Sequence, residues 1–388
     1  MGPVCRAIAA AVCLAAVVAS QVRLPLQTSG RWIVDASGTR VKLRCVNWAG
    51  HLEVNLPEGL HARPLAELAD WVRDRGFNCV RLTYSTDHAL HPDVSIADAF
   101  AGAAAATDVP ISDMMALHDA AVAANPFLGG AETTTRDVFG TVIDALWARG
   151  VMTVLDNHVS RAGWCCDLTD GNGWWDVATG YDAANSRFFH TDRWLRGLQA
   201  MADADGRHAD WYHLLGRAGA LVHQVNPDVL VIIGGTFMAT DLSFVRLLQP
   251  LNTTGWAGKH VWEWHTYSFS LTVPHVLPCR ARQQLYGLFA GFVLRQHQPY
   301  TGPLLLSEFG VDQTGGHGPN GLSHLDSRYL SCLVDYLRRN DAEWAVWALQ
   351  GSYYVRNKQT NYNETWDLLN HNWTALRNPR FFELLRGI

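Results

Sequence analysis

Charged residues are scarce in this chain, and no basic cluster stands out among them. They make up 17% of the 388 residues, with 31 Lys and Arg against 36 Asp and Glu, so the formal net charge is −5. Proteins that bind nucleic acid or an anionic membrane surface gather Lys and Arg on one face or segment. We therefore expect neither of these partners.

Long apolar runs are also missing, except for a short one at the N-terminus. Arg6 is the only charge in the first 20 residues, the apolar run covers residues 8–18, and Val18, Ala19 and Ser20 offer a small-residue cleavage site. This is the pattern of a secretory signal peptide, and the run is shorter than the ~20 residues of a spanning helix. We expect a signal peptide over residues 1–20, a mature secreted protein over 21–388, and no integral membrane segment.

The cysteine spacing fits no zinc site, and we expect no metal and no cofactor. Without the signal peptide, the remaining cysteines are Cys45, Cys79, Cys165, Cys166, Cys279 and Cys332. In an oxidising compartment they predict disulfides whose pairing the sequence leaves open. The adjacent Cys165 and Cys166 suggest a disulfide-stapled loop. Sequons at Asn252, Asn363 and Asn372 agree with a glycosylating pathway.

No internal repeat or linker divides the chain, and β-rich runs alternate with helical patterns. This alternation predicts an α/β fold with a parallel sheet. The expected strands cover residues 41–48, 78–84, 151–158, 229–235, 260–267, 304–310 and 344–350. The expected helices include residues 64–76, 137–149, 280–297 and 325–340, with a partly helical connection over 87–133.

Seven strands are one fewer than a closed (β/α)8 barrel contains. Between the third and the next strand lie two consecutive helical patterns, over residues 192–204 and 208–225. Only Asp205, Gly206 and Arg207 separate them, so the alternation breaks where a fourth strand belongs. We therefore predict a TIM-type barrel in which strand four has been deleted.

The expected strand ends carry a consistent set of polar and aromatic residues. The run Leu304 to Gly310 places Glu308 at a strand tip, where barrel enzymes carry catalytic groups. Other strand ends supply Arg81, His158 and Trp347, and the period of two puts His265 and Tyr267 on one face. Glu263 shares that parity but lies deeper, and we expect it to be buried and paired with a cation.

The motifs at these strand ends resemble glycoside hydrolase family 5, the cellulase-type barrels, and especially its secreted eukaryotic branch. The matching segments cover the chain from about residue 31 and comprise residues 40–48, 76–83, 155–158 with 163–166, 265–267 and 307–310. The resemblance implies a β-linked glycan or glycoconjugate as substrate. It also implies that Glu308 is the nucleophile, supported by Arg81, His158, His265 and Tyr267, with Trp347 as the sugar platform.

One element of this resemblance is missing, namely the Asn-Glu pair that ends strand four and supplies the acid/base. The only Asn-Glu dipeptide is Asn363-Glu364, beyond the last expected strand. Asp203, Asp205 and Asp210 lie at the junction, where capping and loop roles are expected. The resemblance thus implies a retaining hydrolase whose acid/base is unidentified and whose turnover is impaired. The alternatives are a non-catalytic carbohydrate-binding pseudoenzyme and the product of an incomplete gene model. A metal-dependent hydrolase has only Asp156 and His158 in its favour.

Overall fold

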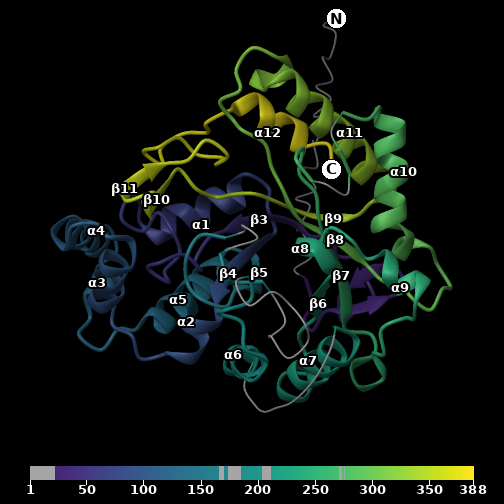
Figure 1. Cartoon of the computed structure of the whole chain (residues 1–388), viewed down its shortest axis with the longest axis horizontal. Coiled ribbons are helices and arrows are strands. Elements are labelled where there is room, and N and C mark those ends of the chain that lie inside the picture. Colours follow the sequence, from purple (N-terminus) through teal and green to yellow (C-terminus); the bar gives the residue numbers. More distant parts are fainter. Residues whose placement is uncertain (1–21, 166–169, 174–184, 203–210, 271–272, 275) are drawn as a thin grey trace, which may run out of the picture.

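A parallel sheet of seven strands forms the centre of the molecule (Figure 1). The computed structural model describes residues 22–165, 170–173, 185–202, 211–270, 273–274 and 276–388. The sheet order is β5-β4-β3-β9-β8-β7-β6, and every neighbouring pair is parallel. The strands are β3 (Arg44–Trp48), β4 (Cys79–Ser85), β5 (Met152–Val159), β6 (Val231–Gly234), β7 (His260–His265), β8 (Leu304–Phe309) and β9 (Glu343–Val346). All seven predicted strands are therefore confirmed, with small shifts at their ends.

Burial along the strands follows their position in the sheet. Every residue of β4 and β8 is buried, as expected for parallel strands that are covered on both faces. In contrast, most of β5 is only partly buried, and Leu155 is 38% exposed. This difference places β5 at an open margin of the sheet.

The sheet curls but does not close within the described residues. β5 and β6 are its two edge strands, and each pairs on one side only. In the chain they are separated by helices α6 (Thr191–Ala202) and α7 (Trp211–Val225). The observed architecture is an α/β half-barrel, and its opening lies where strand four was predicted to be missing.

Helices cover the outer face of the sheet, with the hydrophobic core between the two layers. The larger ones after strands are α1 (Leu65–Asp74), α5 (Thr135–Trp147), α10 (Cys279–Phe289) and α11 (His324–Asn340). A capping box of Thr134 and Asp137 begins α5. Smaller helices are α8 (Thr236–Ala239), α9 (Ser243–Leu247) and α12 (Pro379–Leu385). Within the described residues, no helix is long and apolar enough to cross a membrane.

Three features differ from the sequence prediction. The helix expected over residues 280–297 ends at Phe289 and is followed by the 3-10 turn η4 (Gly291–Leu294), so the single-helix prediction was wrong. The connection after β4 is mostly helical, with α2 (Thr86–Leu90), α3 (Ile96–Thr107), α4 (Ile111–Ala124) and η1 (Pro126–Gly129). Two hairpins were not predicted, β1–β2 (Gln27–Ser29, Trp32–Val34) and β10–β11 (Ser352–Arg356, Gln359–Asn363).

The disulfide prediction is confirmed for the pairs that the structure describes. Cys45 joins Cys79 between β3 and β4, and Cys279 joins Cys332 between α10 and α11. Cys165 is also disulfide-bonded, while Cys166 lies outside the described residues. Cys45 and Cys79 point into the curled sheet and pack with Met152, Val261 and Leu305. This apolar layer fills the half-barrel at the end where its strands begin. Polar residues occupy the other end, where the strands finish, which we call the upper end.

Candidate active site

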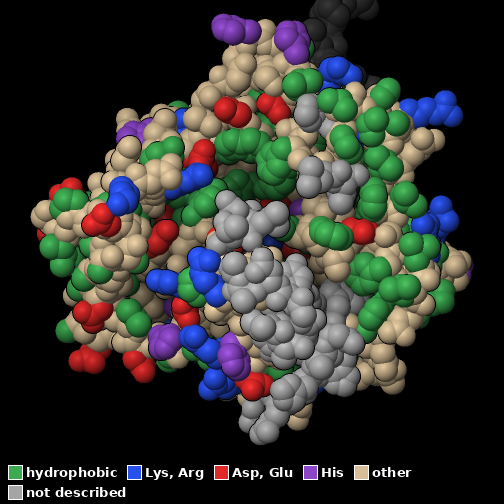
Figure 2. Space-filling view, in the orientation of Figure 1, with side chains coloured by type: hydrophobic (Ala, Val, Ile, Leu, Met, Phe, Trp, Pro, Cys, Tyr) green, Lys and Arg blue, Asp and Glu red, His purple; other side chains and the backbone are tan. Residues whose placement is uncertain are grey.

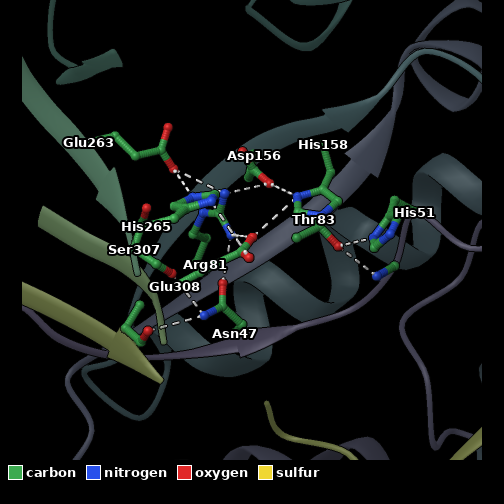
Figure 3. Close-up of polar contacts among 12 residues, drawn as sticks. Asn47, His51, Arg81, Thr83, Asp156, His158, Glu263, His265, Ser307 and Glu308 are labelled. Atoms are coloured by element: carbon green, nitrogen blue, oxygen red, sulfur yellow. Dashed lines mark hydrogen bonds and ion pairs between the residues drawn. The ribbon is translucent and has the colours of Figure 1, made fainter. Parts of the chain in front are cut away.

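Arg81 lies at the centre of a polar network at the upper end of the half-barrel (Figure 3). Its Nη1 is 2.8 Å from Glu308 Oε1, and its Nη2 is 3.0 Å from both Glu263 Oε1 and Asp156 Oδ2. The four residues come from β4, β8, β7 and β5, so alternation along four strands brings them together. One guanidinium therefore binds three carboxylates. The predicted pairing of Glu263 with a cation is confirmed.

Asn47, at the end of β3, orients this guanidinium. Its Oδ1 accepts a hydrogen bond from Arg81 Nη1 at 2.8 Å, while its Nδ2 donates to the backbone oxygens of Ser307 and Val346 at 2.9 and 3.1 Å. Asn47 is fully buried and Arg81 is 2% exposed. Asn47 thus connects Arg81 to the backbone of β8 and β9, and these contacts fix the position of the guanidinium.

The environment keeps Glu308 ionised. Burial raises the pKa of its carboxyl group, but His265 and then Arg81 outweigh burial and lower the pKa to about 2. Tyr267 adds a hydrogen bond from its hydroxyl to Glu308 Oε2 at 3.1 Å. A carboxylate in this state can act as a nucleophile at any pH above about 2.

Two histidines lie on opposite oxygens of Glu308. His265 Nδ1 is 3.7 Å from Oε2, and its Nε2 is 3.3 Å from Glu263 Oε1. Burial lowers the pKa of His265, but Glu308 and Glu263 raise it more, so the net shift is upward. His158 Nδ1 is 3.7 Å from Oε1 and 2.7 Å from Asp156 Oδ2. The site residues predicted on β5, β7 and β8 are therefore brought together.

Trp347 borders the same site. Its ring stacks on that of His158, with centroids 5.9 Å apart and an interplanar angle of 22°. The His158 ring also contacts that of His51, with ring centroids 4.3 Å apart, and His51 Nδ1 lies 2.7 Å from Thr83 Oγ1. Burial holds the pKa of His51 well below its ordinary value, so this imidazole is neutral.

Sequence reasoning did not select Asn47, His51 and Thr83, and it gave Asp156 only a metal-binding alternative. Parity could have found Thr83 and Asp156, because they lie two residues from Arg81 and His158 on the same strands. Asn47 alternates in the same way with the inward-facing Cys45. His51 lies in a loop, where no periodicity applies.

The metal-dependent alternative gains no support from this geometry. Asp156 and His158 bind each other, and Asp156 also binds Arg81, whose charge occupies the place of a cation. Another group of close donor atoms consists of His51, His158 and Cys165. Cys165 is disulfide-bonded and offers no thiolate.

The described residues place no free second carboxyl group beside Glu308. Glu263 and Asp156 are both bound to Arg81, and the attraction of Arg81 outweighs burial and lowers the pKa of Glu263, so that carboxyl is not a proton donor. Glu364 of the Asn-Glu dipeptide pairs with Arg356 beside the β10–β11 hairpin. Asp203, Asp205 and Asp210 lie outside the described residues.

A curled parallel sheet with a buried, ionised carboxylate, histidines and an indole at its strand ends defines the class of barrel hydrolases that act on O-glycosyl bonds. Residues 34–352 match the family model "Cellulase (glycosyl hydrolase family 5)". The chain belongs to this family and is a hydrolase of O-glycosyl bonds.

Known proteins with similar sequences agree. A glycosyl hydrolase 5 family protein of Chamaecyparis obtusa is 36% identical over 411 residues, covering 97% of this chain and 68% of the relative. An endoglucanase of Paenibacillus polymyxa is 22% identical, over 93% of this chain and 86% of the relative.

The fold has close counterparts among solved structures. The catalytic domain of the major endoglucanase of Xanthomonas campestris pv. campestris superimposes with a TM-score of 0.67 at 21% identity, over 93% of this chain and 99% of that one. An endocellulase of Pyrococcus horikoshii, in complex with cellotetraose, gives 0.65 at 17% identity, over 94% and 99%. The half-barrel therefore corresponds to the barrel of cellulases.

Proposed function

We propose that this protein is a secreted retaining β-glycosidase in which Glu308 is the nucleophile, and that it acts on a β-linked glucan or related glycan. The observation that carries this proposal is the Glu308 carboxylate, which is buried, ionised and bound by Arg81 and Tyr267 at the end of β8. A retaining hydrolase needs such a carboxylate to form the glycosyl-enzyme intermediate. The endoglucanase names of two similar proteins favour a β-glucan.

In this mechanism each described residue has a defined role. Glu308 attacks the anomeric carbon, and the C–O bond to the leaving group breaks with its electron pair on the departing oxygen. Arg81 and Tyr267 hold the carboxylate in place and keep it ionised. His158 and His265 contact the sugar hydroxyls, and Trp347 supports the pyranose through its apolar face.

We further propose that turnover is impaired because the chain lacks its acid/base. A retaining enzyme places a second carboxyl group roughly 5–5.5 Å from the nucleophile. Its expected place is the end of a strand between β5 and β6, the two edge strands of the described sheet. The alignment with the Chamaecyparis relative spans 411 positions, more than the 388 residues of this chain, so the relative contains residues without a counterpart here. Both observations support a missing segment.

Secretion rests on separate support. The N-terminal 20 residues have the composition of a signal peptide. The paired cysteines fit an oxidising compartment, and the sequon residues Asn252, Asn363 and Asn372 are exposed. Intact-mass analysis of protein from a secreting eukaryotic host, before and after glycosidase treatment, tests this part. An unprocessed N-terminus without glycans would contradict it.

Activated substrates test the hydrolase proposal. A 2,4-dinitrophenyl β-glycoside has a leaving group that departs without protonation, so it should glycosylate Glu308 even without the acid. We expect a burst of dinitrophenolate, slow release of the intermediate, acceleration by azide with formation of a β-glycosyl azide, and negligible hydrolysis of unactivated glucan. Efficient glucan hydrolysis would show that another carboxyl group serves as acid/base.

The carbohydrate-binding pseudoenzyme is the second candidate, and the lack of a second free carboxyl group beside Glu308 in the described residues favours it. It predicts oligosaccharide binding by calorimetry with no burst from any activated glycoside. The burst assay and the calorimetry, made on one protein preparation, therefore distinguish the two candidate functions.

A further inference from the structure

Phe269 is the exposed end of an aromatic stack that begins at the candidate nucleophile. Tyr267 donates its hydrogen bond to Glu308, and the Phe269 ring stacks on Tyr267 with centroids 5.0 Å apart and an interplanar angle of 12°. Phe269 itself is 65% exposed. A stack of this kind offers a flat apolar face one ring away from the reacting carboxylate.

Trp366 completes this surface from another part of the chain. Its ring meets Tyr267 at 6.0 Å and Phe269 at 5.9 Å, in both cases edge-on. A Cβ atom on Gly310 would lie 3.6 Å from Trp366 Cε3 and 3.1 Å from the backbone oxygen of Trp347. Trp366 and Trp347 therefore flank the glycine that follows the nucleophile strand. We call Tyr267, Phe269 and Trp366 the aromatic platform.

The backbone fixes the direction in which Phe269 points. The Ser270 hydroxyl accepts a hydrogen bond from the Tyr267 amide at 2.9 Å, and the Ser270 amide donates to the Tyr267 carbonyl at 3.1 Å. Both bonds close a tight turn whose outward residue is Phe269. Some of the other exposed apolar side chains lie on or next to α9 and α10, such as Leu248 at 75%, and Figure 2 shows hydrophobic surface there. The described contacts do not connect these residues to Glu308.

The two oxygens of Glu308 face different aromatic surfaces. Oε1 faces Arg81 and His158, whose ring stacks on Trp347. Oε2 faces Tyr267 and therefore the aromatic platform. A glycoside that reacts at Glu308 has two parts to place, the sugar that becomes attached and the group that leaves. With Trp347 supporting the attached sugar, the platform remains for the leaving group.

We propose that the aromatic platform of Tyr267, Phe269 and Trp366 binds the leaving group of the substrate through a flat, apolar face, such as that of a pyranose ring or an aryl aglycone. This inference rests on the proposed function, because it presumes that Glu308 is the nucleophile. Phe269 and Trp366 would then determine specificity on the leaving-group side.

Two substrates that share a sugar but differ in leaving group test the proposal. 2,4-Dinitrophenyl β-cellobioside presents an aryl ring to the platform, whereas β-cellobiosyl fluoride presents a single atom, and neither needs an acid. We expect Phe269→Ala and Trp366→Ala each to lower kcat/KM for the aryl substrate by about two- to tenfold, from an aromatic contact of ~0.5–1.5 kcal/mol. The same variants should leave the fluoride unchanged. Phe269→Tyr should retain the aryl activity, and the matched control Leu248→Ala should change neither substrate.

The pyranose form of the leaving group has its own measurement. Cellobiose should compete with the aryl substrate in the unaltered chain more strongly than in Phe269→Ala. Equal losses for aryl substrate and fluoride would overturn the proposal and assign Phe269 a structural role, while the hydrolase function stands. Full aryl activity in both alanine variants would also overturn it. No reaction of the unaltered chain with either substrate would instead overturn the proposed function, and the platform inference with it.

Discussion

Asn47 accepts a hydrogen bond from Arg81 at 2.8 Å, so the guanidinium that binds Glu308 is itself held from β3. The same amide group donates to backbone oxygens at the ends of β8 and β9. Asn47 therefore links the orientation of Arg81 to the register of three strands. A change at this residue should affect both the site and the sheet.

Asn47→Ala should lower the free energy of unfolding by about 1–3 kcal/mol, because it removes the buried hydrogen bonds that Asn47 makes with Arg81 and with the backbone oxygens of Ser307 and Val346. The burst rate with a dinitrophenyl glycoside should fall as well. Urea unfolding and the burst assay measure the two effects. Asn55→Ala, which removes a side-chain amide from the loop after β3, serves as a control for the site. An unchanged stability and burst rate would show that Arg81 does not depend on Asn47.

A mechanism-based 2-fluoroglycoside should label Glu308. The expectation follows from its ionised state and from its contacts with Arg81 and Tyr267. Peptide mapping by mass spectrometry identifies the residue that carries the adduct, and Glu308→Gln should carry none. An adduct on Glu263, the other carboxylate bound to Arg81 from a neighbouring strand, would overturn the assignment.

His265→Asn should move the acid limb of the burst rate to higher pH. After burial, which raises the pKa of Glu308, His265 is the largest influence and lowers it, to about 2. Without the imidazole the pKa rises toward its ordinary value, so the carboxylate becomes protonated, and the rate falls, at a higher pH than in the unaltered chain. The pH dependence of the burst rate measures this shift. The exposed His297→Asn is the matched control, and identical profiles for the two variants would refute the role of His265.

The same shift predicts how stability depends on pH. Because the folded pKa of Glu308 is depressed, its contribution to stability is present above the ordinary pKa and is lost as pH falls toward about 2. The pKa of His265 is shifted in the opposite direction, so its contribution to stability depends on pH in the opposite way. Its raised pKa contributes stability below the ordinary value of 6.5, and this is lost as pH rises through the folded pKa. His265→Asn should therefore weaken the decline in stability above neutral pH, which urea titrations at several pH values would detect.

Supplying a strand between β5 and β6 should stabilise the fold. Both strands have one unpaired edge in the described sheet, and a barrel strand would pair with both. A chain that carries the corresponding segment of the Chamaecyparis relative between α6 and α7 should have a clearly higher unfolding midpoint than the present chain. A Gly/Ser segment of equal length is the control. Comparable midpoints for all three proteins would mean that the junction is not the site of a missing strand.

The sequence was most informative where a regular alternation, either of side chains along a strand or of strands and helices along the chain, determined where a residue lies. Alternation along β4 and β7 predicted that Arg81 and His265 lie at the same end of the sheet as Glu308, and both contact it in the structure. Tyr267 also contacts Glu308 but lies two residues beyond β7. The broken βα alternation coincides with the opening of the described sheet. Residues whose role depends on long-range contacts were missed. Asn47 acts through carbonyl oxygens about 300 residues away in the chain, and Trp366 reaches the site from a loop without periodicity. Hairpin β10–β11 was missed because the sequence after the last expected strand carries no strong alternating pattern.

The contact between His265 and Glu308 also affects how tightly His265 holds its proton during the proposed reaction. Burial opposes protonation of His265, and Glu308 is the strongest of the groups that favour it. Once Glu308 becomes a glycosyl ester it carries no charge, so His265 loses that attraction while Arg81 keeps repelling its proton. The imidazole should therefore hold its proton less tightly in the intermediate than in the free enzyme. Each cycle would then include a state in which a basic nitrogen arises beside the ester that water must attack.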